Sequence, residues 1–187
     1  RRFNLDVEND LHFFRTLHSF CFNLSDIQHD QLLGAEHLRE LGYSIGFNLV
    51  SKDSHDDDDI GTASRDNPCM QLIQLARLKK QTIEKTYNES SIDVPYIEVE
   101  YINESYHNYK KANRLYDYTD ILEWFAEHGG RVCPKFDVTF LDEAQDLSPL
   151  QREIAHILND NSRRMYAAGD DDQAIYRWAG ADVEHFL

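Results

Sequence analysis

The sequence predicts an α/β fold, in which a parallel β-sheet is accompanied by a mostly helical region. A strand–helix–strand pattern, with apolar segments at residues 136–141 and 165–168 on either side of an amphipathic segment, predicts the sheet. Apolar residues at helical spacing through the middle of the chain predict the helical region. The 187 residues, 41% of them hydrophobic, suffice for one ordinary domain or for one domain carrying a smaller insertion.

Charge and composition exclude two broad classes of protein. No segment approaches the ~18 consecutive apolar residues that span a bilayer, so we expect no membrane partner. The formal net charge of −15 argues against a general nucleic-acid coating protein, because neutralising phosphates requires Lys and Arg. Any DNA contact must therefore be local. Basic residues concentrate within 77–85 and 110–114, where a solvated helix face and a DNA-contacting surface are both open interpretations.

The cysteines and the N-terminal residues bear on the cellular compartment. Cys21, Cys69 and Cys133 are odd in number and lack the spacing of a zinc site, so we predict reduced, structural thiols. The sequence begins RRFNLD, without an apolar signal core, which we interpret as a cut or processed edge. The expected compartment is the cytoplasm.

The middle of the chain is predicted to contain one long helix preceded by an acidic loop. Asn67 and Pro68 offer a cap and a first helical residue, and apolar residues then recur at helical spacing as far as Tyr87. The preceding segment, residues 51–67, includes the aspartates of residues 56–59. Their mutual repulsion favours a loop over a metal site.

Two shorter helices are predicted on either side of this segment. Residues 30–41 form the first, ended by Gly42, and residues 120–127 form the second, ended by Gly129. The alternation of residues 96–101 is too weak to choose between a strand and a loop. The region as a whole is therefore predicted to be mostly helical.

The C-terminal part of the chain has the clearest pattern. Residues 136–141 are rich in aromatic and β-branched side chains, which predicts a buried strand of a parallel sheet. Ser148 and Gln151 form a capping box with Pro between them, so a helix follows. The apolar segment 165–168 predicts a second strand, which completes a βαβ unit.

Polar side chains follow both predicted strands at the point where each strand ends. Ligands of open α/β sheets bind beyond the carboxyl ends of the strands, where Asp142, Glu143 and Gln173 are placed. One carboxylate can hold a hydrated Mg²⁺ ion while the other orients or deprotonates a water molecule. Gln173 can sense a terminal phosphate by hydrogen bonding. The alternative is that the acidic pair merely caps the next helix.

The residues around this acidic pair resemble a known family. The stretch LDEAQDLSPLQ, residues 141–151, resembles the Walker B segment of UvrD/Rep-type superfamily 1 DNA helicases, whose core pattern is DExQD followed by Gln. The stretch GDDDQAIYRWAGAD, residues 169–182, resembles the next motif of that family, GDxDQxIYxWRGA. Weaker likenesses are TLHSF at residues 16–20, similar to TxHSF, and LYDYTDIL at residues 115–122, similar to DFxDLL.

The resemblance implies roles for individual residues. Asp142 would help to position Mg²⁺, and Glu143 would be the general base for the hydrolysis of ATP. Gln173 would couple the γ-phosphate to the DNA site. Tyr176 and Trp178 match aromatic positions on which such helicases stack single-stranded bases, with burial in the core as the alternative for both.

The resemblance also implies a domain organisation. Residues 1–25 and 115–187 would form part of a RecA-like (P-loop NTPase) domain, and residues 26–114 would form an inserted helical subdomain that contains the acidic loop. Thr16 and His18 match a segment that lies near the DNA backbone in the family. For His18, a packed position in the core is the alternative.

Departures from the family pattern limit what this chain would do alone. It contains no GxxxxGK[ST] sequence, so the phosphate-binding loop is missing, as is the second RecA-like domain. Position 179 is Ala where the family usually has Arg, which puts one DNA or nucleotide contact in doubt. We therefore predict an intact protein that is an ATP-dependent 3′ to 5′ helicase, acting on single-stranded DNA and duplex junctions, and an inactive isolated chain.

Two other functions stay open. The first is a non-enzymatic, helicase-like module that binds DNA or a protein partner. The second is a metal-dependent nuclease that uses Asp142, Glu143 and the aspartates of residues 170–172. The nuclease hypothesis leaves Gln173 and Trp178 without a role.

Overall fold

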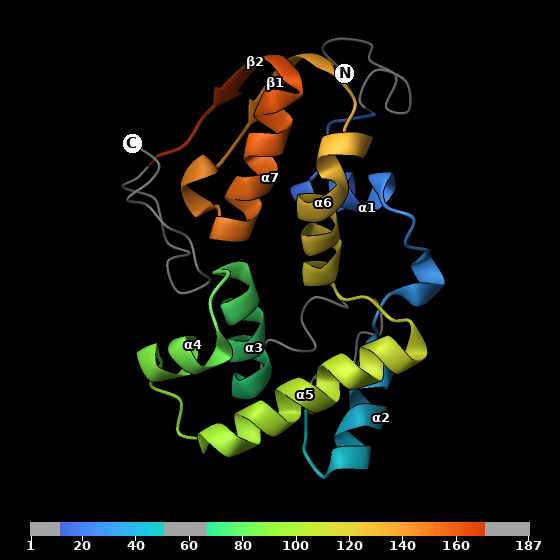
Figure 1. The fold of residues 1–187 in the computed structure, drawn as a ribbon, viewed down its shortest axis with the longest axis vertical. Helices are drawn as coiled ribbons and strands as arrows, with labels where there is room; N and C mark the ends of the chain where they lie inside the picture. The colour runs from blue at the N-terminus through green and yellow to red at the C-terminus, as the bar shows by residue number, and fades with distance from the viewer. Residues whose placement is uncertain (1–11, 51–66, 171–187) are drawn as a thin grey trace, which may run out of the picture.

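The computed structural model describes residues 12–50 and 67–170, and within them the chain is a mixed α/β structure that is mostly helical (Figure 1). The helices are α1 (Leu17–Leu24), α2 (Ala35–Ile45), α3 (Pro68–Leu78), α4 (Ile83–Glu89), α5 (Tyr96–Asn113), α6 (Tyr118–Val132) and α7 (Pro149–Asp160), with 3₁₀ turns η1 (His29–Gln31) and η2 (Ala144–Asp146). The strands are β1 (Phe136–Leu141) and β2 (Ser162–Ala167).

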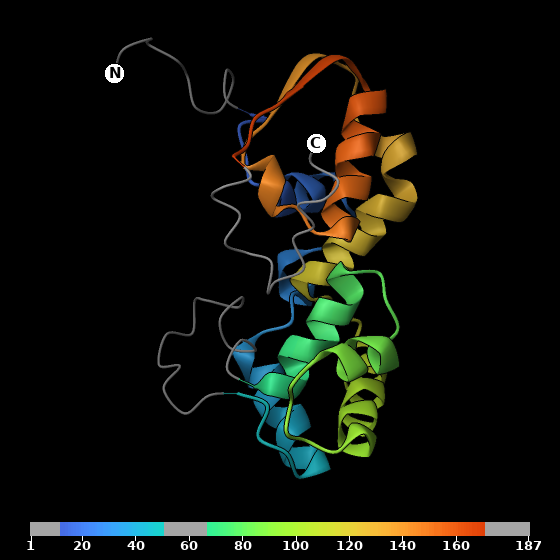
Figure 2. The ribbon, with the colours of Figure 1, turned by 90° about the vertical axis from the view of Figure 1, so that its left-hand side faces the viewer.

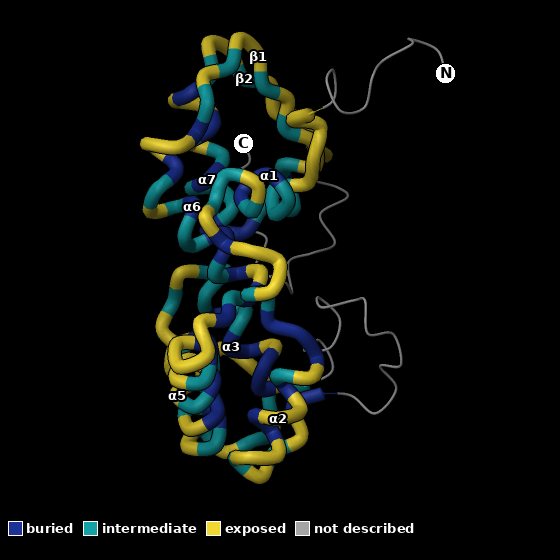
Figure 3. The backbone as a smooth tube through the Cα atoms, turned by 90° about the vertical axis from the view of Figure 1, so that its right-hand side faces the viewer, coloured by how far each residue is buried: buried dark blue, intermediate teal, exposed yellow. Residues whose placement is uncertain are grey.

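These elements divide between the two ends of an elongated molecule. Figures 1 and 2 show α1, α6, α7 and both strands at one end, and α2, α3, α4 and α5 at the other. Each end has its own buried apolar interior, visible as dark segments of the chain in Figure 3. The helical cluster consists of Leu33, Ala35, Leu38, Leu41, Leu49, Val50, Cys69, Met70, Leu72, Ile73, Val99, Ile102, Tyr106 and Leu115. The sheet cluster consists of Phe20, Cys21, Ile27, Ile121, Leu122, Phe125, Cys133, Leu150, Ile154 and Leu158.

The two strands form a parallel sheet joined by helix α7. Phe136 pairs with Ser162 at one end of the register and Leu141 with Ala167 at the other. The predicted bounds of the first strand are confirmed, and the second begins earlier than the predicted segment. The capping box is also confirmed, because the backbone N–H of Ser148 donates to Gln151 Oε1 at 2.9 Å.

The prediction that the first strand is buried is wrong for the residues that the structure describes. Val138, Phe140 and Tyr166 are exposed on one face of the sheet, and the side chain of Phe140 has an exposed fraction of 78%. The rings of Phe140 and Tyr166 stack with their centroids 5.5 Å apart. Parallel sheets are normally covered on both faces, and none of the elements within residues 12–50 and 67–170 covers this one.

The predicted long helix from Asn67 to Tyr87 is two helices. The side chain of Asn67 caps α3 as predicted, accepting from two backbone N–H groups. Helix α3 ends at Leu78, and Lys80 then takes a left-handed conformation with φ 53°. Thr82 starts α4, where its Oγ1 accepts from the N–H of Lys85 at 3.2 Å. Thr82 is a favourable N-cap, so a new helix starts there although the apolar spacing continues from α3 into α4.

Two glycines predicted to end helices lie inside them. Helix α2 passes Gly42 and ends at Ile45, and the following Gly46 caps it with a left-handed φ of 76°. Gly42 instead allows a close approach of the backbone, because a Cβ atom there would lie 2.5 Å from the carbonyl oxygen of Phe47. Gly129 likewise does not stop α6, and a Cβ atom there would meet the ring of Phe125 at 2.7 Å.

The segment that the sequence left undecided, residues 96–101, begins helix α5. At the end of α5 the chain returns to the point where the helical part began. Tyr116 pairs in parallel with Leu32, with the N–H of Tyr116 donating to the carbonyl of Gln31 at 2.8 Å and the N–H of Leu33 donating to Tyr116 at 2.9 Å. The two chain crossings between the ends of the molecule therefore lie side by side.

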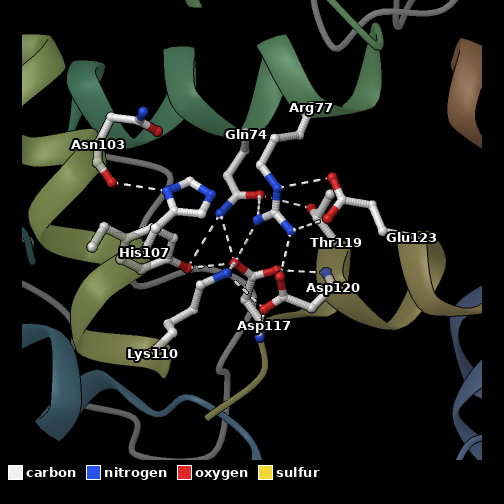
Figure 4. A network of polar contacts seen from close by, with 10 residues as sticks. Gln74, Arg77, Asn103, His107, Lys110, Asp117, Thr119, Asp120 and Glu123 are labelled. Atoms are coloured by element: carbon white, nitrogen blue, oxygen red, sulfur yellow. Dashed lines mark hydrogen bonds and ion pairs between the residues drawn. The ribbon is translucent and has the colours of Figure 1, made fainter. Parts of the chain in front are cut away.

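A buried network of charges joins α3, α5 and the start of α6 (Figure 4). The guanidinium of Arg77 contacts Asp117, Asp120 and Glu123 at 2.6 to 2.7 Å. The ammonium of Lys110 contacts Asp117 and Asp120, both at 2.6 Å. We call these five residues the junction network. Two cations thus share three carboxylates, and neither cation faces solvent.

Neutral side chains complete the hydrogen bonding of the junction network. The hydroxyl of Tyr106 donates to Asp117 at 2.6 Å, and Asp117 also caps α6 by accepting from the N–H of Asp120 at 2.8 Å. Burial favours the neutral acid, but Arg77 and Lys110 outweigh it and hold the pKa of Asp117 well below its usual range. Buried charges persist only when paired and hydrogen-bonded in this way.

The junction network shows the environment of one basic residue from each of the segments 77–85 and 110–114. Arg77 and Lys110 are neither on a solvated helix face nor available to DNA, because both are buried among carboxylates. Lys79 and Lys85 both pair with Glu89. The cysteines are free and buried as predicted, and no helix within the described ranges is long and apolar enough to cross a membrane.

Candidate functional site

The exits of the two strands lie together at one edge of the sheet. Backbone pairing continues past the strands, because the N–H of Ala168 donates to Leu141 at 2.8 Å and the N–H of Ala144 donates to Ala168 at 2.9 Å. The residues that follow β1 are Asp142 and Glu143, and those that follow β2 lead to Asp170. Asp142 and Glu143 therefore stand at this edge after β1, and Asp170 stands at the same edge after β2.

The two carboxylates of the first exit, Asp142 and Glu143, are both exposed. The N–H of Glu143 donates to Asp142 Oδ1 at 3.1 Å. Glu143 adopts a left-handed backbone with φ 54°, which costs a residue with a Cβ atom about 1 kcal/mol. This conformation turns the chain from β1 into η2. It leaves both carboxylates accessible to a ligand beyond the strand ends.

Gln145 connects the two strand exits through its side-chain amide. Its Nε2 donates to Glu143 Oε2 at 2.6 Å, and its Oε1 accepts from the backbone N–H of Asp170 at 3.1 Å. Its exposed fraction is only 1%. The sequence predicts no role for Gln145. Its position inside the DExQD pattern is the signal that could have identified it.

The neighbouring Asp146 has an unusual environment. Its Oδ1 is buried without a hydrogen-bond partner among the described residues. Burial, with a further contribution from the charge of Glu143, raises the pKa of Asp146. Both the burial of this oxygen and the nearby charge of Glu143 disfavour the ionised form of Asp146.

Thr16 and His18 lie at the start of α1. Thr16 is exposed, and its Oγ1 caps the helix by accepting from the N–H of Ser19 at 3.3 Å. His18 is partly buried, with its ring edge-on to Tyr118 at a centroid distance of 5.9 Å. Burial lowers the pKa of His18, which favours a neutral ring. This environment favours the packed interpretation of His18, while Thr16 keeps a surface position.

Comparison with known proteins decides the relationship. The family model of the UvrD/REP helicase N-terminal domain matches residues 7–187, which is nearly the whole chain. The chain belongs to this family. The resemblance carried by residues 141–151 and 169–182 is thereby confirmed.

Individual relatives of this UvrD/REP helicase domain are bacterial. The putative ATP-dependent DNA helicase YjcD of Bacillus subtilis is 24% identical over 179 residues, covering 92% of this chain and 23% of that protein. The ATP-dependent DNA helicase PcrA of B. subtilis is 29% identical over 96 residues, covering 46% of this chain and 13% of that protein. PcrA of Staphylococcus aureus is 31% identical over 68 residues, 36% of this chain and 8% of that protein. The chain thus spans a quarter or less of these relatives.

Several expected site residues of this UvrD/REP domain lie outside the described residues. They are Gln173, Tyr176 and Trp178, together with Ala179 and the aspartates of residues 171–172. The acidic segment also lies outside them, except for Asn67, which caps α3. The expectations for these residues stay predictions.

The described residues of the UvrD/REP domain fit a magnesium–nucleotide complex. No group of three or more His, Cys, Asp or Glu residues in the described ranges could hold a metal ion by itself. Mg²⁺ carried by a nucleotide needs only one or two carboxylates, because phosphate oxygens and water fill the other positions. Exposed Asp142 supplies such a hard oxygen donor at the strand exit. The donor set suits Mg²⁺ that arrives with phosphates.

Proposed function

We propose that this chain is the Walker B part of an ATP-dependent DNA helicase, a 3′ to 5′ translocase that couples ATP hydrolysis to movement along single-stranded DNA. The observation that carries the proposal is the pair of exposed carboxylates, Asp142 and Glu143, at an edge where Gln145 joins both strand exits. Membership of the UvrD/REP helicase family supports it.

In this proposal the two carboxylates divide the chemistry between them. Asp142 binds the Mg²⁺ ion of the nucleotide, and Glu143 takes a proton from the attacking water. When bound, Mg²⁺ neutralises charge that develops on the β- and γ-phosphates. The separation of the two roles is supported by the different contacts of the two side chains, because Gln145 donates to Glu143 and Asp142 accepts from the N–H of Glu143. Gln173 binds the γ-phosphate and reports it to the DNA site.

The DNA side of the proposal rests on fewer observations. Tyr176 and Trp178 stack against unpaired bases, each contact contributing roughly 1 to 3 kcal/mol to binding. Thr16, whose surface position supports the proposal, contacts the DNA backbone. His18 lies in the same segment, and in this proposal it packs against Tyr118 and supports the position of Thr16. DNA junctions are the proposed substrate of the longer protein.

The proposed domain organisation places a RecA-like domain at residues 1–25 and 115–187, with residues 26–114 as an inserted helical subdomain. Support comes from the two separate apolar clusters and from the side-by-side crossings at Leu32 and Tyr116. The exposed face at Phe140 supports a sheet that is completed and covered by further chain. The phosphate-binding loop belongs to that further chain in this proposal.

The test is Mg²⁺-dependent ATP hydrolysis by the full-length gene product, with and without single-stranded DNA. We expect hydrolysis that DNA stimulates, and a loss of about 10²-fold or more in kcat for Glu143→Gln, because a general base contributes on this scale. Glu127→Gln, at an exposed position on α6, removes the same charge and is the matched control. We expect no change in kcat for the control.

Equal, negligible hydrolysis by the wild type and Glu143→Gln would refute the proposal and favour the non-enzymatic module. Residues 1–187 alone are expected to be inactive, since they contain no GxxxxGK[ST] sequence. A nuclease would instead cleave DNA with Mg²⁺ and without ATP, so the same samples distinguish it.

A further inference from the structure

We infer that Gln145 is a positioning residue, which holds the carboxylate of Glu143 in place and links it to the exit of β2. This inference rests on the proposed function of Glu143 as a general base. It goes further, because it names the part of the protein that sets the orientation of that base. It also names the route by which a change at the second strand exit reaches it.

The first argument is that both polar atoms of the buried Gln145 amide form hydrogen bonds. The Nε2 group can only donate, and it donates to Glu143 at 2.6 Å. The Oε1 atom can only accept, and it accepts from the N–H of Asp170 at 3.1 Å. Rotating the amide by half a turn would break both bonds, so only one orientation fits. With an exposed fraction of 1%, Gln145 is shielded from the bulk solvent that could replace either partner.

The second argument is the freedom that Gln145 removes from Glu143. Glu143 is exposed, and an exposed Glu side chain samples many rotamers. The bond from Gln145 engages Oε2 and leaves Oε1 available for a water molecule. A general base must be held within hydrogen-bond reach of the proton it takes, so a fixed carboxylate favours the reaction.

The third argument concerns the second strand exit. The backbone N–H of Asp170 is bound to the same amide that holds Glu143. A displacement of the chain at Asp170 therefore moves or releases the carboxylate through a single side chain.

The main test is Gln145→Met in the full-length gene product, because Met has similar length and neither hydrogen bond. We expect kcat of DNA-stimulated ATP hydrolysis to fall by about tenfold or more, and KM for ATP to change by less than about threefold. Gln31→Met is the matched control, since Gln31 also accepts a backbone N–H bond, from Gln28 at 2.9 Å. We expect the control to hydrolyse ATP like the wild type.

A double-mutant cycle separates positioning from general structural damage. If Gln145 acts through Glu143, then adding Gln145→Met to Glu143→Gln produces no further loss in single-turnover hydrolysis. If Gln145 is merely a core residue, the two losses multiply. A multiplied loss would overturn the inference, as would a wild-type kcat in Gln145→Met.

Hydrogen exchange gives a readout that does not depend on catalysis. The amide of Asp170 should exchange about fivefold faster in Gln145→Met, which is the scale of one lost hydrogen bond. Unchanged exchange at Asp170 would contradict the link to β2. Gln145→Asn, which keeps a buried amide but is too short to reach both partners, serves as the second variant if the Met variant does not fold. It should lower kcat in the same direction.

These outcomes distinguish the inference from the proposed function. If Glu143→Gln retains DNA-stimulated hydrolysis, the proposed function itself is wrong. If Glu143→Gln is inactive while Gln145→Met and Gln145→Asn match the wild type, only the positioning role of Gln145 is wrong.

Discussion

The junction network and the strand exits treat charged groups in opposite ways. At the junction, Arg77 and Lys110 are buried and share three carboxylates. At the strand exits, Asp142 and Glu143 are exposed, and Glu143 is held by a single amide. The first arrangement satisfies its charges internally and joins helices, while the second leaves oxygen atoms available for a ligand. Charges are therefore paired internally at one place and exposed to solvent at the other.

The largest expected effect comes from breaking the junction network at its centre. Asp117→Ala leaves Arg77 and Lys110 buried with fewer anions and removes the cap of α6. Removing one partner of a buried ion pair costs about 3 to 5 kcal/mol. We therefore expect the free energy of unfolding of the full-length protein, measured in urea, to fall by that amount. Asp137→Ala, at an exposed position on β1, is the control and should change stability by less than ~0.5 kcal/mol.

Acid unfolding gives a second measurement of the same network. Because the pKa of Asp117 is lowered in the folded state, its stabilising effect is fully present above its unfolded pKa of about 3.9 and is lost as the pH falls further. The wild type should lose stability more steeply below about pH 4 than Asp117→Asn, which cannot titrate there. Parallel acid curves for the two proteins would contradict the role assigned to Asp117.

An intermediate effect is expected at the exposed face of the sheet. Phe140→Thr should change the stability of residues 1–187 by less than ~0.5 kcal/mol, because Phe140 is exposed there. In the full-length protein, where further chain covers this face under the proposed function, the same change should cost about 2 kcal/mol. Tyr43→Thr, at an exposed aromatic on α2, is the control and should be neutral in both. Equal small effects in both proteins would mean that the face stays uncovered.

The smallest effect is expected for a surface ion pair between the turn before α4 and helix α7. Lys80 contacts Glu153, and both side chains are about half exposed. Glu153→Gln should lower the unfolding free energy by less than ~1 kcal/mol, and the difference should shrink in about 1 M salt. A loss as large as that of Asp117→Ala, independent of salt, would remove the distinction between buried and surface charges.

Local signals in the sequence were sufficient for the βαβ unit. The strand at 136–141 and the capping box at Ser148 depend on neighbouring residues, so they were predicted correctly. The helices of the middle region were predicted less well. Gly42 and Gly129 lie inside helices because a neighbouring backbone or ring approaches them, and no local pattern reveals such an approach.

The candidate site was predicted in part, for the same reason. The motif around Asp142 and Glu143 identified the strand exit. The motif did not reveal the contacts of Gln145, because its second partner, the N–H of Asp170, is distant in the sequence. The environment of Arg77 was not predictable for a similar reason, since its carboxylate partners Asp117 and Asp120 lie about forty residues away, at the start of α6. Contacts between segments that are far apart in the sequence could not be predicted from local patterns.

The pairing of Leu32 with Tyr116 has a consequence for how this molecule can change over evolutionary time. A segment whose two ends lie side by side can be lengthened, shortened or replaced, because the rest of the chain keeps Leu32 and Tyr116 next to each other. Replacing residues 33–115 by a short turn should therefore leave α6, α7 and both strands able to fold. The part of the chain with the sheet and the inserted helices could then change in length independently of each other.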